Sequence, residues 1–246
     1  MQDATASAVR ASRRLEAVGA SLQAVVVAAA GSAGSPMGSA GSPMGSSRFA
    51  DPEDWSSPTK ASPAEPTSGC KLLIGTNNFG TRITNTAEVL GALAGLGIDE
   101  IDTARAYNSG KSEEALGAAF AADPATAAQL TVGSKVTWMK LGYQQVNDDL
   151  AASLSALGKD CLDIYYLHAP DHTASLLETL RAVHEAHAAG QFKEFGVSNF
   201  RPWQLVQIIN LMEQHNWSPL PTVYQGAYNA VQRDAESDLL PLCRRG

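Results

Sequence analysis

The stretch CLDIYYLHAPDHTASLLETLRAVHEAHAAGQFKEFGVSN, residues 161–199, decides the fold class of this chain. It opens with CLDIYYLH (161–168), a run of apolar and aromatic residues that predicts a buried strand. A helix is predicted over residues 174–189, and Gly190 ends it. FKEFGVSN (192–199) then predicts a second strand. Two strands joined by a helix form a βαβ unit, in which the strands run parallel.

The same alternation continues on both sides of this unit. Further strands are predicted at residues 71–76, 98–103, 130–136 and 221–226, and further helices at 85–96, 112–120, 143–157, 202–215 and 233–245. Ser112, followed by two acidic residues, is typical of a helix N-cap, and Pro202 suits a first helical turn. Six βα repeats predict a parallel sheet covered by helices.

Two architectures contain such a sheet: an open doubly wound sheet and a (β/α)₈ barrel. The alternation alone does not choose between them. The glycines of IGTNNFG (74–80) lack the GxGxxG spacing that follows the first strand of a doubly wound dinucleotide fold. This difference counts against the open sheet.

Residues 1–68 differ from the rest of the chain in composition. They are rich in Ala, Ser, Gly and Pro, and the unit GSAGSPM occurs at 31–37 and again at 38–44. Such a sequence buries too little apolar surface to offset the entropy lost on ordering its backbone. We therefore expect a disordered leader and linker over residues 1–68 and one domain over residues 69–246.

Composition also limits location and partners. The run AVVVAAA (24–30) is too short to span a membrane, and we expect a cytoplasmic protein. Because the run follows Arg10, Arg13 and Arg14, a transit peptide for an organelle is the alternative. A net charge of −7 argues against a nucleic-acid-binding surface. The three cysteines lie far apart without a CxxC pair, which favours free thiols over disulfides or zinc.

Polar side chains follow the predicted strands at their carboxyl ends. They are Asp102 with Tyr107 just beyond it, Lys135, His168, Ser198 with Asn199, and Gln225. Singly, each has an ordinary structural explanation as a cap, a packing residue or a solvated charge. In a barrel, however, the carboxyl ends of the strands converge on one rim, so the set predicts an active site there.

The set suits the reduction of a carbonyl group. The ammonium of Lys135, held by Asp102, would favour the phenolate form of Tyr107 and make its phenol a usable general acid. His168 can donate a hydrogen bond to the same carbonyl oxygen.

Hydride must come from a cofactor, because side chains cannot supply it. Ser198, Asn199 and Gln225 have the donors and acceptors to hold a carboxamide such as that of nicotinamide. No metal is expected, since Asp171 and His172 lack a third ligand at suitable spacing.

Five motifs, in this order and spacing, resemble the aldo-keto reductases. They are DTARAY (102–107), GSK (133–135), YYLHAPD (165–171), GVSNF (196–200) and VYQGAYN (223–229). LHAPD and PTVYQGAY are most similar to the aflatoxin aldehyde reductase branch. The likeness covers about residues 71–246. It implies a (β/α)₈ barrel that reduces aldehydes and ketones to alcohols, with NADPH more often than NADH as the cofactor.

The resemblance also implies a role for each matching residue. Tyr107 would be the proton donor, and Asp102 and Lys135 would tune it. His168 would orient the substrate carbonyl. The nicotinamide amide would be held by three residues, which are Ser198, Asn199 and Gln225.

The sequence departs from the family in length. A (β/α)₈ barrel needs roughly 250 residues, and from residue 71 this chain has room for about six units of roughly 30 residues. The resemblance thus implies a C-terminally truncated barrel. In relatives, the seventh and eighth units bind the cofactor phosphates and supply an aromatic ring that stacks on the nicotinamide. We therefore expect unpaired edges on the strands of the first and sixth units, and weak or absent NADPH binding. An incomplete gene model, a short isoform and a pseudoenzyme would each explain the length.

Two other functions are compatible with the same fold. One is a nicotinamide-responsive regulatory subunit, as in the potassium-channel β subunits, and the other is an inactive interaction module. LHAPD and VYQGAY favour the enzyme branch. The expected partner is a small carbonyl substrate, with no nucleic acid and no membrane. Substrate identity and oligomeric state are left open by the sequence.

Overall fold

A parallel sheet forms the centre of the domain. The computed structural model describes residues 23–24 and 72–245. The predicted leader and linker, with their GSAGSPM repeat, therefore lie outside the described residues, apart from residues 23–24. Neighbouring strands pair in parallel in the order β1-β7-β6-β5-β4-β3-β2. The strands are β1 (Gln23–Ala24), β2 (Ile74–Gly75), β3 (Glu100–Asp102), β4 (Thr131–Lys135), β5 (Leu162–Leu167), β6 (Phe192–Ser198) and β7 (Pro221–Gln225).

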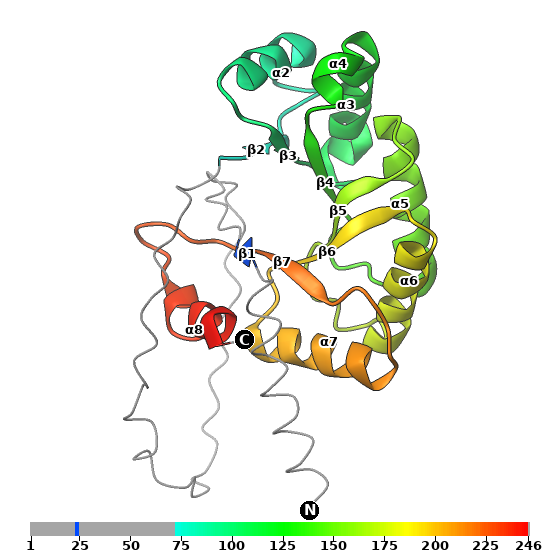
Figure 1. Cartoon of the computed structure of the whole chain (residues 1–246), viewed down its shortest axis with the longest axis vertical. Helices are drawn as coiled ribbons and strands as arrows, with labels where there is room; N and C mark the ends of the chain where they lie inside the picture. The colour runs from blue at the N-terminus through cyan, green and yellow to red at the C-terminus, as the bar shows by residue number, and fades with distance from the viewer. Residues whose placement is uncertain (1–22, 25–71, 246) are drawn as a thin grey trace, which may run out of the picture. The chain divides into compact units, whose positions relative to one another are not determined.

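Each strand from β2 to β7 is followed by a helix. The α-helices are α2 (Thr86–Gly95), α3 (Lys111–Ala122), α4 (Pro124–Ala127), α5 (Tyr143–Leu157), α6 (Leu176–Ala188), α7 (Pro202–Gln214) and α8 (Leu239–Arg245), and two 3₁₀ helices cover Tyr107–Gly110 and Asp234–Glu236. In Figure 1 the sheet curves, and α3, α5, α6 and α7 lie along its outer side. These six βα units form part of a (β/α)₈ barrel, which confirms the predicted fold class.

The main core lies between the sheet and the helices. One face of α5 is buried there, with Val146 and Leu150 both at 0% exposure. Along β5 the side chains alternate. Tyr165 belongs to this main core, whereas Tyr166 belongs to a second, smaller cluster with Ile164 and Val223. One face of β5 thus builds the helix-covered layer, and the other builds the lining inside the curve.

Two local predictions were wrong. Ser112 is not the N-cap of α3: the cap is Gly110, and Ser112 is buried in the first turn, where its hydroxyl donates to the Phe79 carbonyl at 3.1 Å. The predicted last helix begins later, at Leu239, after the 3₁₀ turn Asp234–Glu236. In both places a tertiary contact or a short turn replaced the regular pattern.

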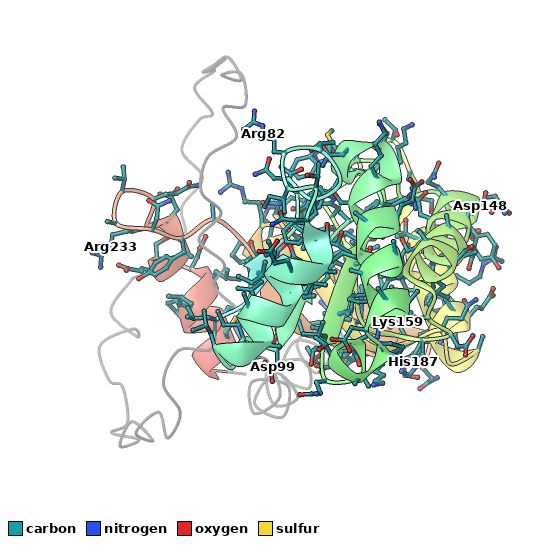
Figure 2. The ribbon with its side chains drawn as sticks, turned by 90° about the horizontal axis from the view of Figure 1, so that it is seen from above. Arg82, Asp99, Asp148, Lys159, His187 and Arg233 are labelled. Atoms are coloured by element: carbon teal, nitrogen blue, oxygen red, sulfur yellow. The ribbon has the colours of Figure 1, made fainter. Side chains whose placement is uncertain are left out.

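The two outer edges of the sheet differ. The outer edge of β7 pairs with β1, Gln23 with Val223 and Ala24 with Tyr224, so this edge is partly paired rather than free as expected. Among the described strands, none pairs with the outer edge of β2. Charged residues such as Arg82, Asp148 and Arg233 project from the periphery (Figure 2). In the part of the chain that the structure describes, no helix has the length and apolar character to cross a membrane.

Candidate active site

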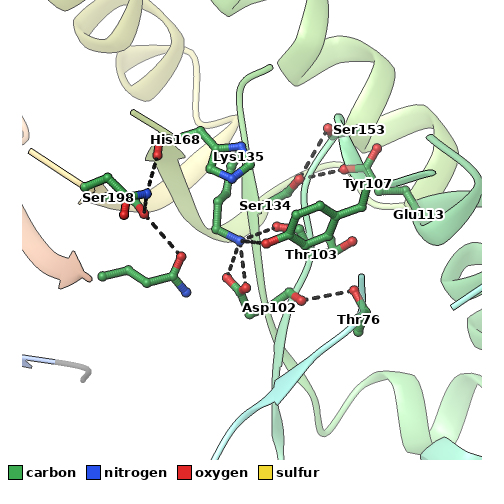
Figure 3. A network of polar contacts seen from close by, with 12 residues as sticks. Thr76, Asp102, Thr103, Tyr107, Glu113, Ser134, Lys135, Ser153, His168 and Ser198 are labelled. Atoms are coloured by element: carbon green, nitrogen blue, oxygen red, sulfur yellow. Dashed lines mark hydrogen bonds and ion pairs between the residues drawn. The ribbon is translucent and has the colours of Figure 1, made fainter. Parts of the chain in front are cut away.

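The strand ends place the predicted site residues along one rim. Asp102, Lys135, Ser198 and Gln225 are the last residues of β3, β4, β6 and β7. His168 and Asn199 directly follow β5 and β6, and Tyr107 opens the 3₁₀ helix after β3. Parallel pairing in register brings these ends to the same side of the sheet (Figure 3).

Lys135 is the centre of this group. Its side chain is 0% exposed, and its Nζ lies 2.6 and 2.7 Å from the two carboxylate oxygens of Asp102. The same Nζ donates to the Thr103 carbonyl at 2.8 Å and to the Tyr107 hydroxyl at 3.2 Å. A buried ammonium requires such a set of acceptors, because burial without them is very unfavourable.

Two glycines make room for a ring beside the ammonium. A Cβ atom on Gly196 would lie 2.2 Å from Tyr166 Cδ1, and one on Gly133 would lie 3.0 Å from Tyr166 Cε2. The Tyr166 ring therefore lies across both neighbouring strands. Its centroid is 5.8 Å from Lys135 Nζ, and burial raises the pKa of Tyr166 well above its ordinary value. A neutral, apolar surface thus borders the Lys135 charge.

The loop that carries Tyr107 has an unusual backbone. Asn108 and Ser109 have φ angles of +50° and +56°, in the left-handed region that few residues adopt. The Asn108 amide compensates by donating to the carbonyls of Asn77 at 2.5 Å and Phe79 at 3.2 Å. Tyr107 itself is half-buried, so part of its side chain remains accessible to solvent.

His168 is the neutral member of the site. The residue is 7% exposed, and its ring meets the Tyr107 ring edge-on, with centroids 5.8 Å apart. Burial, reinforced by the nearby charge of Lys135, lowers the pKa of His168 from 6.5 to about 3. At neutral pH the imidazole is therefore uncharged and carries one N–H donor. Trp138, a residue that is 47% exposed, also packs edge-on against the His168 ring, with centroids 4.9 Å apart.

A chain of amide and hydroxyl groups continues from His168. Asn199 Nδ2 donates to the His168 carbonyl at 3.0 Å and to Ser198 Oγ at 2.9 Å, and Ser198 Oγ donates to Gln225 Oε1 at 3.4 Å. Asn199 has a φ of +62°, which turns its side chain back over the strand end. All the sequence-predicted site residues are thus joined by consecutive contacts, from Asp102 through Lys135, Tyr107 and His168 to Gln225.

Two polar groups in this hydrogen-bonded series can each take a further hydrogen bond. Among the described residues, Asn199 Oδ1 and Gln225 Nε2 have no hydrogen-bond partner. One is an acceptor and the other a donor, and a primary carboxamide presents the complementary pair. The residues present therefore fit a nicotinamide amide in their chemistry.

Sequence reasoning missed several residues that shape the site. Arg105 lies inside the DTARAY motif, and Glu113 was interpreted only as part of a cap, yet the two form an ion pair at 2.7 Å in which Glu113 is buried and Arg105 is 18% exposed. Tyr166 and Trp138 carried no signal beyond strand hydrophobicity and loop position. Asp163, inside β5, has a structural role: its Oδ2 accepts from the Val132 amide at 2.9 Å, across to β4.

Asp171 and His172, considered and set aside as metal ligands, lie in the loop before α6. Asp171 accepts hydrogen bonds from the Leu141 amide at 3.0 Å and from the Thr173 amide at 2.8 Å. Within the described residues, no group of three or more His, Cys, Asp or Glu side chains could hold a metal ion.

The fold and this rim define a class of protein. Residues 71–246 match the aldo/keto reductase family, and the chain belongs to that family of NAD(P)H-dependent oxidoreductases. It is similar to an aldo-keto reductase from Pseudocercospora fijiensis, with 40% identity over 152 residues, which cover 59% of this chain and 50% of the relative.

Relatives from mammals carry more specific names. The chain is 36% identical to aflatoxin B1 aldehyde reductase member 2 of Mus musculus over 195 residues, 76% of this chain and 53% of the relative. It is 37% identical to aflatoxin B1 aldehyde reductase member 4 of Homo sapiens over 177 residues, 70% of this chain and 53% of the relative. The chain spans about half the length of the curated relatives it matches.

Proposed function

We propose that this chain reduces aldehydes and ketones to alcohols with NADPH, and that Tyr107 donates the proton. The observation that carries the proposal is the contact between Lys135 Nζ and the Tyr107 hydroxyl at 3.2 Å. An ammonium has three donors and no acceptor, so in this contact the phenol oxygen accepts. The phenol proton is then free for another acceptor, and among the described residues Tyr107 has no second hydrogen-bond partner.

Proton donation from Tyr107 fits its surroundings. A carbonyl oxygen that gains negative charge takes the proton, and the phenolate left behind is stabilised by the Lys135 ammonium. Asp102 and the Thr103 carbonyl hold that ammonium in place from the other side. The neutral His168 ring lies edge-on to Tyr107, and an N–H on the side of the ring that faces the phenol would orient the same oxygen.

The amide groups of the rim support a nicotinamide cofactor. Asn199 Oδ1 and Gln225 Nε2 would hold its carboxamide, and Ser198 keeps both side chains in place through its hydroxyl. When bound, the nicotinamide supplies the hydride that the carbonyl carbon receives. The names of the mammalian relatives point to aldehydes as the substrate class.

The test is the reduction of an aromatic aldehyde by the 246-residue chain. The reaction is measured as the loss of NADPH absorbance. Because the chain is expected to bind NADPH weakly, the cofactor is supplied in large excess, and the wild-type chain should then oxidise NADPH only when the aldehyde is present. Tyr107→Phe should lower turnover by about 10²- to 10⁴-fold, the usual contribution of a general acid. It should leave NADPH affinity, measured by isothermal titration, nearly unchanged.

Tyr143→Phe is the matched control, because the Tyr143 hydroxyl on α5 donates to Glu185 on α6 and not to a residue of the site. It should keep full turnover. Wild-type turnover that survives Tyr107→Phe would show that Tyr107 is not the proton donor. A wild-type chain that binds NADPH but reduces no carbonyl compound would refute the reductase proposal.

A further inference from the structure

Glu113 is a buried carboxylate whose hydrogen bonds do not involve the Lys135 ammonium. It lies in the first turn of α3 with 0% exposure, on the helix side of the sheet. Burial raises the pKa of Glu113, and hydrogen bonds from Ser134 and Ser153 together with the charge of Arg105 oppose that rise. A carboxylate in such a place is unfavourable unless its oxygens are bonded, so its partners show what it holds.

Its two oxygens bind two different elements of the site. Oε2 pairs with Arg105 Nη1 at 2.7 Å, and Oε1 accepts from Ser134 Oγ at 2.6 Å. Arg105 stands two residues before Tyr107, and Ser134 directly precedes Lys135. Because side chains alternate along β4, Ser134 points to the helices while Lys135 points to the rim. One carboxylate therefore joins the loop of the phenol, through Arg105, to the strand of the ammonium, through Ser134. Figure 3 shows the contact between Glu113 and Ser134.

The loop needs such a tie. Residues 108–110 all have positive φ, with Gly110 at +91°, and backbone of this kind persists only where surrounding contacts hold it. The Arg105 side chain lies directly against Gly110, where an added Cβ would be 1.3 Å from Nη2. The Arg105 amide also donates to the Lys135 carbonyl at 3.1 Å. Arg105 thus transmits the position of Glu113 to the turn that carries Tyr107.

We propose that Glu113 is a positioning residue that sets the separation of the Tyr107 hydroxyl and Lys135 Nζ through Arg105 and Ser134. The proposal rests on the proposed function only for its kinetic consequence; the positioning itself is a property of the folded chain. A purely structural role for Glu113 would change stability without moving the phenol.

The experiment observes the phenol directly. The full chain is labelled with ¹³Cζ-tyrosine, and the Tyr107 resonance, one of six tyrosine signals, is assigned with Tyr107→Phe. Lys135→Met provides the reference position of a phenol that has lost its ammonium. The test variants are Glu113→Ala and Ser134→Ala, with Glu113→Gln as the conservative replacement and Tyr165→Phe as control. Tyr165 is equally buried and loses one hydrogen bond, to the Val146 carbonyl, outside the network.

We expect the Tyr107 signal to move toward the Lys135→Met position in Glu113→Ala and in Ser134→Ala. Glu113→Gln, which can still bond both partners, should restore most of the wild-type position, and Tyr165→Phe should not move the signal. If Glu113→Ala does not fold, Ser134→Ala decides, because it removes a single hydroxyl. A Tyr107 signal that stays at its wild-type position in folded Ser134→Ala would overturn the proposal.

Turnover separates this proposal from the proposed function. In a chain that reduces aldehydes, Ser134→Ala should lower kcat by up to ~10²-fold, as misplacement of a reacting group does, with little change in the KM for NADPH. A moved signal in a chain without turnover supports the positioning role and refutes the reductase. An unmoved Tyr107 signal in a chain with turnover supports the reductase and overturns the positioning role of Glu113.

Discussion

Lys135 Nζ lies 2.6 Å from one carboxylate oxygen of Asp102 and 2.7 Å from the other, and the Lys135 side chain is fully buried. Removing one member of a buried ion pair leaves the other charge uncompensated. Asp102→Asn should therefore lower the free energy of unfolding by about 3 kcal/mol or more, measured by urea denaturation of the full chain.

The control for that change is the pair of Lys193 and Asp163, which has the same 2.6 Å separation but leaves Lys193 67% exposed. Solvent weakens such a pair, so Lys193→Met should change the free energy of unfolding by less than about 1 kcal/mol. Equal losses in the two variants would mean that the burial of Lys135 does not strengthen its dependence on Asp102.

His168 should stay neutral across the physiological range. Burial and the charge of Lys135 lower its pKa from 6.5 to about 3, so its NMR signals should not titrate between pH 5 and pH 8. A histidine with a depressed pKa contributes stability that is present above pH 6.5 and is lost as the pH falls from 6.5 toward 3. Lys135→Met should raise the pKa of His168 only in part, because burial is the larger cause. A His168 signal that titrates near pH 6.5 in the folded wild-type chain would show that the ring is not buried as described.

Asp171 should make the chain sensitive to acid. Burial alone would raise the pKa of this carboxyl, but hydrogen bonds from the Thr173 hydroxyl and from backbone amides, including that of Leu141, lower it from 3.8 to about 2. Its stabilisation is present above pH 3.8 and is lost as the pH falls toward 2. In Asp171→Asn the fraction of folded chain should therefore fall less steeply over that pH range. Circular dichroism measures this fraction. An acid transition that is unchanged in Asp171→Asn would show that other carboxyls govern it.

Gly196→Ala tests the seat of Tyr166. The new methyl group would lie 2.2 Å from Tyr166 Cδ1, inside the sheet, where neither partner can move freely. We expect a loss of about 1–3 kcal/mol in the free energy of unfolding. Gly91→Ala is the matched control, since nothing lies within 4 Å of the added Cβ in α2. It should instead stabilise the chain by about 0.5–1 kcal/mol, because alanine loses less entropy in a helix. Calorimetry on both variants measures these changes. A lower free energy of unfolding in Gly91→Ala, or an unchanged one in Gly196→Ala, would contradict this packing.

The order of the elements was predictable from the sequence because it depends on local periodicity. The helix predicted over residues 143–157 is found with the same bounds, and β5 and β6 lie within the stretch that opened the prediction. Predictions failed where one side chain had two available partners. Ser112 could cap α3 or bond to the Phe79 carbonyl, and only the approach of that carbonyl, 33 residues earlier, decided the outcome.

The candidate site divides in the same way. The sequence by itself determined which chemistry stands at each strand end, from Asp102 to Gln225, because a parallel strand must end on the same side as its neighbours. It could not show that the Lys135 ammonium donates to the Tyr107 oxygen, or that Glu113 ties the two residues from behind the sheet. Those relationships are distances between elements remote in sequence, and they exist only once the helices pack against the sheet. Because a buried charge cannot be solvated by water, its hydrogen bonds depend on the neighbours that the tertiary structure brings within reach.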